Sequence, residues 1–407
     1  MIPYSFQQID EDDIKEVEEV LKSPFLTQGP KVKEFEENLA KKIKAKYVVT
    51  FSSGTSALLA LYFSILRKYF NFFKTPKDFY NKKRFYFITS PITFSATSNA
   101  AVYLGGIPLF VDIKEDGNID LEKLYSFLDR LKKKHRKIFN NLKFITIVHY
   151  AGNPVDTKKA YEIGKIFNKP ILEDACHALG AYNKYETIGS CKYSLGATFS
   201  FHPVKPITCG EGGAVSTNNK EIFETLLLFK NHGIKRKKAW IYDMQFLSLN
   251  HRLSDIHAAL GNSQLKKLDK FLNIRRNLAK IYYKLFKDVT FAKPIKQLDS
   301  SSYHLFPVRF KFKNLKQKEI FFNLLREKGI GVQVHYIPIY MLSFYKNLFK
   351  TFKEIYKSIY GTLNLRYNLK ESYNFYKEEL SIPLSQSLEE EDIYNIFEII
   401  VDTYKNL

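Results

Sequence analysis

The sequence of 407 residues predicts an α/β protein, with a large domain built on a mostly parallel sheet and a smaller α+β C-terminal domain. The first observation is that short β-branched or aromatic runs alternate with longer helical patterns from about residue 50 to 230. The second is that two strand-like runs flank a helical one after about residue 290. The third is the length, which favours two lobes.

In the first region the alternation predicts helices on both faces of the sheet. Ligands of such sheets bind in the loops at the carboxyl ends of the strands, so a site is expected there. The predicted strands are 84–90, 107–113, 143–150, 169–175, 197–202 and 212–217. Helical patterns lie between most of them, at 57–69, 95–104, 119–134 and 155–167.

A long helix is predicted to link the two domains. The hydroxyl of Ser254 can cap its first turn. Beyond this cap, leucines recur at i, i+3 and i+7, which is the spacing of one helix face: Leu265, Leu268 and Leu272.

The C-terminal region predicts the smaller α+β domain. Strand-like segments at 303–312 and 332–339 are separated by a helical segment at 317–329. We place the domains at 1–290 and 291–407, with the N-terminal segment 1–35 as a candidate to pack on the smaller one.

The composition limits the function classes. Hydrophobic residues make up 45% of the chain, and no apolar run is long enough to cross a bilayer. The start, MIPYSFQQIDEDDI, is polar and acidic, unlike a signal peptide, so a cytoplasmic protein without a membrane partner is expected. Cys176, Cys191 and Cys209 sit singly, without metal-ligand spacing, which predicts reduced thiols and no metal site.

The formal net charge of +21 has two interpretations. One is nucleic-acid binding, because a basic face can neutralise phosphates. The other is that lysines are spread over solvated helix faces. The longest basic runs, at 131–137 and 235–238, lie beside candidate helices and lack interleaved stacking aromatics. We therefore expect no nucleic-acid partner, although a positive field can gather anionic small substrates.

The segment FSSGTSALLALYF (51–63) predicts the end of a strand, a turn of small residues and the start of a helix. Backbone N–H groups of Gly54, Thr55 and Ser56 would point at an anion near the positive end of the helix dipole. An ordinary capped helix explains the same residues, because Ser and Thr are common caps. Taken alone, the capped helix is the simpler interpretation.

Asp174 closes an apolar strand, where a carboxylate needs a hydrogen-bond donor or a cation. The protonated pyridine nitrogen of a bound cofactor would be such a partner. Capping of a helix start or a salt bridge to a basic side chain would equally satisfy the carboxylate. Lys205 follows a buried strand and precedes a glycine-rich turn. A partly desolvated lysine can have a lowered pKa and form imines. Ser200 precedes Lys205 and could reach the same phosphate as the 54–56 turn.

The order of phosphate turn, acid and lysine is that of aspartate-aminotransferase-type pyridoxal enzymes. More specifically, the amino-acid sequences of several segments resemble those of the DegT-type sugar aminotransferase family. The resemblance implies an aspartate-aminotransferase-like large domain of PLP fold type I, with pyridoxal 5′-phosphate as the cofactor. The segments span most of the chain: FLTQGPKVKEFE (25–36), SSGTSAL (52–58), SPITFSATSNAAVYLGGIPLFVDI (90–113), VHYAGNPVD (148–156), EDACHALGA (173–181), SFHPVKPITCGEGGA (200–214), NHRLSDIHAALGNSQLKKLD (250–269) and YKEELSIPLSQSLEEEDI (376–393).

The resemblance also implies residue roles. Lys205 would hold the cofactor as a Schiff base and move the proton between C4′ and the amino-bearing carbon. Asp174 would pair with the pyridine nitrogen, His177 would contact the phenolic oxygen, and Phe94 would stack on the ring. The phosphate would be held by Gly54, Thr55, Ser56 and Ser200, and by Asn250 from the partner subunit of a homodimer. Arg252, His335 and Tyr336 are candidates for substrate contacts.

Within the family, the segments HPVKPITCGEGG, VHYAGNPVD and VHYIPI are most similar to the transaminases of the pseudaminic acid pathway. That similarity implies transfer of the amino group of L-glutamate to C4 of a UDP-4-keto-6-deoxy-N-acetylhexosamine. The alternative substrate is the UDP-4-keto-pentose of the 4-amino-arabinose branch. Dehydratases of the same fold have histidine where this chain has Lys205. A non-catalytic regulator that binds the cofactor or a sugar nucleotide would be expected to lack Lys205 or Asp174.

Two segments depart from the family pattern. Residues 65–87 are longer and more basic than usual, and residues 349–370 form a second extra segment. Both are expected to be surface elaborations. If either borders the sugar-binding cleft, the substrate would differ from that of the family.

Overall fold

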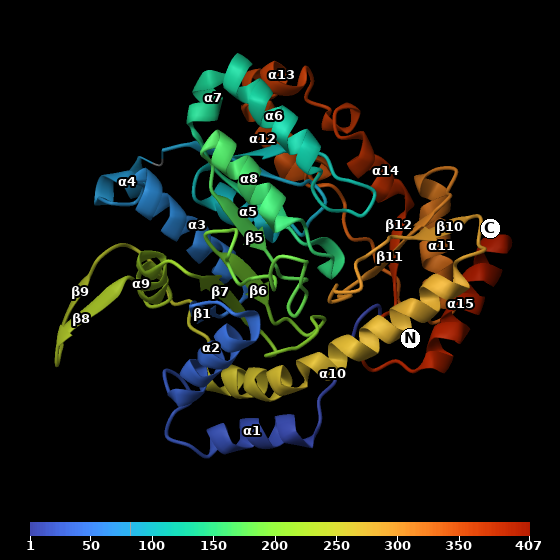
Figure 1. Ribbon diagram of the computed structural model, residues 1–407, viewed down its shortest axis with the longest axis horizontal. Coiled ribbons are helices and arrows are strands. Elements are labelled where there is room, and N and C mark those ends of the chain that lie inside the picture. The colour runs from blue at the N-terminus through green and yellow to red at the C-terminus, as the bar shows by residue number, and fades with distance from the viewer. Residues whose placement is uncertain (82) are drawn as a thin grey trace.

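The computed structural model describes residues 1–81 and 83–407 (Figure 1). Among these residues, the largest sheet has seven strands in the order β1-β7-β6-β5-β4-β2-β3. The adjacent pairs β6–β5, β5–β4, β4–β2 and β2–β3 are parallel. Strand β7 is antiparallel to both of its neighbours, β6 and β1. The mostly parallel sheet is therefore confirmed. Its strands are β1 Tyr47–Phe51, β2 Phe85–Thr89, β3 Gly106–Phe110, β4 Leu142–Val148, β5 Ile171–Asp174, β6 Ala197–Ser200 and β7 Gly213–Thr217.

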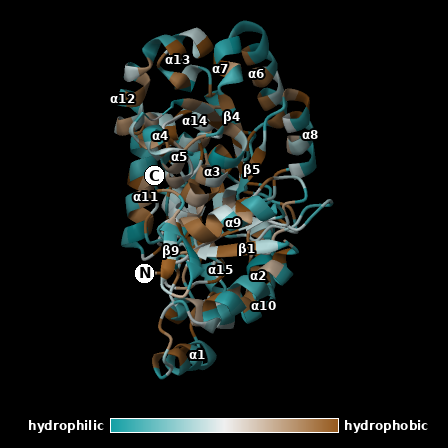
Figure 2. Ribbon diagram, turned by 90° about the vertical axis from the view of Figure 1, so that its left-hand side faces the viewer, coloured by the Kyte–Doolittle hydropathy of each residue, from teal (hydrophilic) through white to brown (hydrophobic). Residues whose placement is uncertain are grey.

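Helices cover both faces of this sheet, and the four predicted between its strands are all present. Because side chains alternate along a strand, Phe87 packs on the side of α3, α5 and α9, whereas Ile88 packs on the side of α6 and α8. The bounds are α3 Gly54–Phe70, α5 Ala96–Tyr103, α6 Leu121–Lys134, α8 Thr157–Phe167 and α9 Lys220–Phe229. The outer helices show alternating hydrophilic and hydrophobic bands, as expected for amphipathic helices (Figure 2).

The long helix α10 (Asp255–Leu285) runs along the lower side of the molecule in Figure 1. The predicted cap is confirmed, since Oγ of Ser254 accepts from the backbone N–H of His257 at 3.3 Å. Leu265, Leu268 and Leu272 pack with β6 and β7, and Leu278 packs in the core of the C-terminal region. The helices α1 (Glu11–Leu21) and α2 (Pro30–Ile43) lie against α10.

The C-terminal region contains an antiparallel sheet in the order β10-β11-β12. The strands are β10 Ala292–Pro294, β11 Phe306–Phe310 and β12 Glu379–Ile382, and the helices packed with them are α11 Leu315–Glu327, α14 Lys370–Glu378 and α15 Glu390–Lys405. The predicted strand at 303–312 and helix at 317–329 correspond to β11 and α11. The division at residue 290 stays a prediction, because α10 contributes to the cores on both sides of it.

The predicted strand at 332–339 is wrong. Gln333 forms an isolated bridge with Ser381, and no named strand follows it within this described segment. Side chains take the backbone donors that a ladder would need: Val334 N donates to Oε1 of Gln333, and His335 N donates to Oε2 of Glu379. The chain is thereby turned so that His335 and Tyr336 face a cavity.

The expectation that both extra segments are surface elaborations is wrong for 349–370 and holds only in part for 65–87, where Lys74, Lys77, Lys83 and Arg84 are exposed. Residues 349–370 include the end of α12 (Ser343–Thr351) and α13 (Lys353–Tyr360), which pack on β3 and α6. The hydroxyl of Tyr356 donates to Pro108 O at 2.8 Å, and that of Tyr360 accepts from Phe110 N at 2.8 Å and donates to Phe110 O at 2.9 Å. These contacts cover the edge strand of the sheet. In the described part of 65–87, Phe72 and Phe73 are buried.

The remaining elements lie on the periphery. A hairpin of β8 (Ile234–Lys238) and β9 (Ile241–Met244) projects from the body (Figure 1). The short helices α4 (Pro76–Tyr80) and α7 (Arg136–Asn140) precede β2 and β4. Among the described residues, no helix is both long and apolar enough to span a membrane.

Candidate functional site

A cavity of about 710 Å³ lies at the carboxyl ends of β5 and β6, beneath the N-terminus of α3. This is the edge of the sheet where the sequence predicts a site. Side chains from the C-terminal region close its other side, among them His304 and Tyr336. The predicted residues that line it are Gly54, Thr55, Phe94, Asp174, His177, Ser200, Lys205, His335 and Tyr336.

The first turn of α3 forms a shallow cradle at one end of the cavity. Ser53 caps the helix, with Oγ accepting from Ser56 N at 3.1 Å. A Cβ on Gly54 would lie 2.8 Å from Cβ of Ser200, so only glycine lets the turn approach β6 this closely. A Cβ on Gly213 would lie 2.4 Å from Ser53 O. The N–H of Ser56 is thus taken by Ser53, whereas those of Gly54 and Thr55 have no hydrogen-bond partner among the described residues and are available for an anion.

Asp174 is buried at the end of β5, with 6% of its surface exposed. Its Oδ2 accepts from Oγ1 of Thr97 at 2.6 Å, and its Oδ1 accepts from Cys176 N at 3.2 Å. Thr97 in turn is bonded to Thr93, one turn earlier, at 2.7 Å between the two Oγ1 atoms. The sequence analysis did not name this pair, although two threonines at i and i+4 beside a predicted helix start were visible in the sequence.

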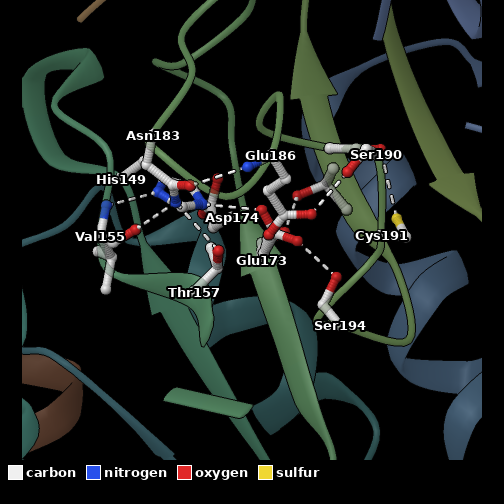
Figure 3. Close-up of polar contacts among 12 residues, drawn as sticks. His149, Val155, Thr157, Glu173, Asp174, Asn183, Glu186, Ser190, Cys191 and Ser194 are labelled. Carbon is white, nitrogen blue, oxygen red and sulfur yellow. Dashed lines mark hydrogen bonds and ion pairs between the residues drawn. The ribbon is translucent and has the colours of Figure 1, made fainter. Parts of the chain in front are cut away.

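Behind Asp174, on the opposite face of β5, lies a second buried carboxylate that the sequence analysis also missed (Figure 3). Glu173 accepts from Oγ of Ser194 at 2.5 Å and contacts Nε2 of His149 at 3.0 Å. Because Nδ1 of His149 accepts from Val155 N at 3.0 Å, the ring proton lies on Nε2 and is donated to Glu173. This network fixes the ends of β4 and β5 and so supports Asp174 from behind. Burial, followed by the charge of Glu173, raises the pKa of nearby Glu186.

Lys205 follows β6 and is half-buried in the wall of the cavity. Its Nζ lies 3.3 Å from Nε2 of His304. Burial lowers the pKa of Lys205, although the nearby Cys176 and Asp174 act in the opposite direction. Within the described parts of the chain, no carboxylate lies close enough to form an ion pair with this amine.

Uncharged aromatic and imidazole side chains dominate the wall opposite α3. Burial lowers the pKa of His177 well below its usual value, and lowers the pKa of His335 to about 3. Nε2 of His177 lies 3.1 Å from the hydroxyl of Tyr336, whose pKa is raised by burial. Phe94 stands at the mouth with 59% of its surface exposed, its ring centroid 6.1 Å from that of Tyr336.

Three predicted residues lie outside this cavity. The hydroxyl of Ser56 points back into its own turn, 3.3 Å from Oγ of Ser52. Asn250 is exposed and its Oδ1 accepts from Arg252 N at 3.2 Å, while the guanidinium of Arg252 donates to Oδ1 of Asn231. Both follow the projecting β8–β9 hairpin.

The sequence pattern of the DegT/DnrJ/EryC1/StrS aminotransferase family matches residues 7–401. The chain is 41% identical over 394 residues to the UDP-4-amino-4,6-dideoxy-N-acetyl-beta-L-altrosamine transaminase of Campylobacter jejuni, covering 96% of this chain and 94% of that protein.

Solved structures show the same similarity. Helicobacter pylori PseC, described as an aminotransferase involved in the biosynthesis of pseudoaminic acid, matches with a TM-score of 0.85 and 34% identity over 100% of both chains. Spr1654 from Streptococcus pneumoniae, solved in its PLP-form, matches with a TM-score of 0.82 and 27% identity over 100% of this chain and 99% of that one.

Proposed function

Because the chain belongs to the DegT/DnrJ/EryC1/StrS aminotransferase family, we propose that it moves the amino group of L-glutamate to C4 of a UDP-4-keto-6-deoxy-N-acetylhexosamine. Family membership makes the protein a sugar aminotransferase of PLP fold type I that depends on pyridoxal 5′-phosphate. The sugar, the amino donor, the partner subunit and the residue roles are the proposal.

The main support for the proposal is the environment of the Lys205 amine, that is, its contacts and its burial. Its amine faces the cavity that also contains Asp174 and the first turn of α3, and the group in contact with Nζ is an imidazole rather than a carboxylate. Burial lowers the pKa of this lysine, which favours the uncharged amine that condenses with an aldehyde. A structural lysine in an ion pair would be held as the ammonium instead.

The residues present fit pyridoxal phosphate. Gly54 leaves room at the N-terminal turn of α3 where a Cβ would meet Ser200, so a phosphate can approach the backbone N–H groups there. Nδ1 of His177 is buried and has no hydrogen-bond partner among the described residues, which leaves this nitrogen available to a ligand. Asp174 supplies the carboxylate expected for a protonated ring nitrogen.

Bound pyridoxal phosphate supplies an aldehyde that exchanges amines and a ring that withdraws electrons. In the proposal, Lys205 would hold the cofactor through Nζ at that aldehyde, and its amine, once displaced by the amino donor, would carry a proton between the two reacting carbons. Asp174 would keep the ring nitrogen protonated, and Thr97 holds the carboxylate in place through its 2.6 Å hydrogen bond. Phe94 would cover one side of the ring and limit the access of water to it.

The proposed sugar rests on the similarity to the Campylobacter jejuni transaminase over nearly the whole chain. The proposed substrates are strongly anionic, so further positive charge is needed near the cavity. Among the described residues that line the cavity, Lys205 is the one lysine, and there is no arginine. In a homodimer, Asn250 and Arg252 lie outside the cavity of their own chain and would reach that of the second copy. His335 and Tyr336 also line the cavity and are proposed to contact the sugar.

The proposal is tested by converting the purified enzyme to its amine-loaded form with L-glutamate, and then offering UDP-4-keto sugars one at a time. We expect the absorbance of the aldehyde-loaded enzyme to return with the 6-deoxy-N-acetylhexosamine ketone and not with the pentose ketone. Lys205→Ala should fold, yet show neither the absorbance of the covalently held cofactor nor turnover.

Each other outcome has a definite meaning. Return of absorbance with the pentose ketone alone would transfer the protein to the 4-amino-arabinose branch. Full turnover by Lys205→Ala would refute the role of this lysine. No response to L-glutamate, with other amino acids active, would refute the proposed donor.

A further inference from the structure

His304 is a buried cavity residue that the sequence analysis did not single out. It lies just before β11, 99 residues after Lys205 in the sequence, and its Nε2 lies 3.3 Å from Nζ of that lysine. An imidazole can accept a hydrogen bond from an ammonium, and a neutral one can also donate to an amine. His304 can therefore stay in contact with Lys205 in either protonation state of the lysine.

The surroundings keep His304 uncharged. Its pKa is well below the usual value, first because it is buried and next because Lys205, His177 and the guanidinium of Arg275 are close. Its ring packs against that of His177 with 4.4 Å between centroids. The partner of Lys205 is thus a polar group that brings no negative charge.

Because His304 adds no negative charge, burial remains the largest influence on the pKa of Lys205. The groups around Lys205 are Asp174 and Cys176 beyond β5, and the uncharged His177, His304 and His335, with Arg275 of α10 behind His304. Tyr4, Tyr336 and Glu211 also line the cavity, and none of the three is hydrogen-bonded or ion-paired to Nζ in the described structure. Burial outweighs the two acids, and the pKa of Lys205 is lowered. Lys31 shows the opposite case, since its contact with Glu16 at 2.8 Å raises its pKa.

The backbone around His304 is held independently of its imidazole. Arg275 is fully buried and donates from Nη1 to Tyr303 O at 3.2 Å and to His304 O at 3.4 Å. Its Nη2 donates to Oγ of Ser5, which donates to Val204 O at 2.9 Å. One guanidinium therefore links the segment that bears His304 to the segment that bears Lys205.

The two ring nitrogens of His304 are also unequally engaged. In His149 both nitrogens are bonded, which fixes the tautomer (Figure 3). In His304, Nδ1 is buried without a hydrogen-bond partner among the described residues. The contact of Nε2 with Nζ of Lys205 is therefore the one polar contact of the ring in the described structure. A histidine required only for packing would have no reason to direct its single bonded nitrogen at the reactive amine.

We propose that His304 is a positioning residue of the transamination: through Nε2 it aims Nζ of Lys205 into the cavity, and, being uncharged, it leaves that amine free to react. The inference rests on the role proposed above for Lys205. It predicts that a neutral hydrogen-bonding side chain can replace His304 and that a carboxylate cannot.

The test uses full-length protein freed of cofactor, to which pyridoxal 5′-phosphate is added at a series of pH values. The rate at which the absorbance of the covalent adduct appears reports the fraction of Lys205 present as amine. For His304→Gln we expect a rate within about threefold of wild type and an unchanged pH midpoint. For His304→Asp the midpoint should rise by at least about one pH unit, so that the rate near neutral pH falls about tenfold.

His135 provides a matched control, because it lies on the surface between α6 and α7 and contacts Ser358 rather than the cavity. His135→Asp adds the same charge and should leave the pH midpoint unchanged. His304→Leu removes the hydrogen bond without adding charge, and is expected to slow the condensation at least about tenfold with no upward shift of the midpoint.

A wild-type pH midpoint in folded His304→Asp, or a wild-type rate in His304→Leu, would overturn the inference. The His304→Leu measurement also decides the question if the aspartate variant does not fold. If Lys205→Ala forms the same adduct, the proposed function fails. If Lys205→Ala forms none while the His304 variants behave as wild type, the inference alone fails.

Discussion

At the scale of single residues, the site depends on side chains that are buried and aimed by neutral partners. Asp174 is the clearest case, since a hydroxyl and a backbone N–H hold its two oxygens, and in the described structure no cation is bonded to it. Such donors stabilise the carboxylate and fix its direction without occupying it as an ion pair would.

This geometry leads to a prediction for Asp174→Asn. The amide keeps the shape but cannot pair as an anion with a protonated ring nitrogen, so we expect kcat to fall about 100-fold, equivalent to about 2.7 kcal/mol, with looser cofactor binding. Steady-state kinetics and cofactor titration measure both effects. Thr97→Val removes one hydrogen bond but keeps the charge, and should cost about tenfold or less. Unchanged kinetics in Asp174→Asn would mean that another acid serves the ring.

The sequence analysis predicted some of the residues that line the cavity and missed others for a physical reason. Asp174 ends the buried strand β5 and Lys205 lies in the loop after β6, and both contexts are visible within a few neighbouring residues. Thr97 and His304 act through contacts that join positions 77 and 99 residues apart. No local pattern encodes such a contact, so three-dimensional structure was needed to find them.

At the scale of elements, the edge strand β3 illustrates how an addition to the chain becomes part of the core. The hydroxyl of Tyr360 satisfies both the N–H and the C=O of Phe110, and both tyrosines of α13 are buried. Unpaired backbone groups at a buried edge would cost free energy, so these contacts stabilise the sheet as well as covering it.

We therefore predict that Tyr360→Phe lowers the free energy of unfolding by about 1–3 kcal/mol, because it leaves the backbone groups of Phe110 buried without a partner. Denaturant unfolding measures the change. Tyr367→Phe is the matched control, since that side chain is 64% exposed, and it should change stability by less than about 0.5 kcal/mol. Equal effects of the two substitutions would contradict the proposed role of the edge contacts.

Element prediction succeeded where periodicity alone determines the structure. The strands of the large sheet and the helix α10 have local hydrophobic patterns, and Ser254 caps α10 as expected. The segment 332–339 has the composition of a strand, but side chains of Gln333 and Glu379 take its backbone donors. Propensity cannot foresee this competition, because Glu379 is distant in sequence.

At the scale of the whole molecule, the cavity of one chain is lined by most of the proposed residues, but not by the side chains of Asn250 and Arg252. Asn250 and Arg252 follow the β8–β9 hairpin, which extends away from the body (Figure 1). Exposed apolar side chains on and around that hairpin include Trp240 at 81% and Tyr242 at 64% exposure. Such a surface favours burial against another protein surface.

If two copies share their sites, inactive variants should complement each other. Lys205→Ala lacks the reactive amine, and Asn250→Ala lacks the phosphate contact that it would donate to its partner. In a mixed dimer, one site combines both defects, while the other receives an intact Lys205 from one copy and an intact Asn250 from the other. Mixing the two variants under conditions that exchange subunits should therefore restore up to about one quarter of wild-type activity, since half of random dimers are mixed and each has one intact site. Activity that stays at the sum of the separate variants, despite subunit exchange verified by differently tagged copies, would place Asn250 in the site of its own chain or outside the site altogether.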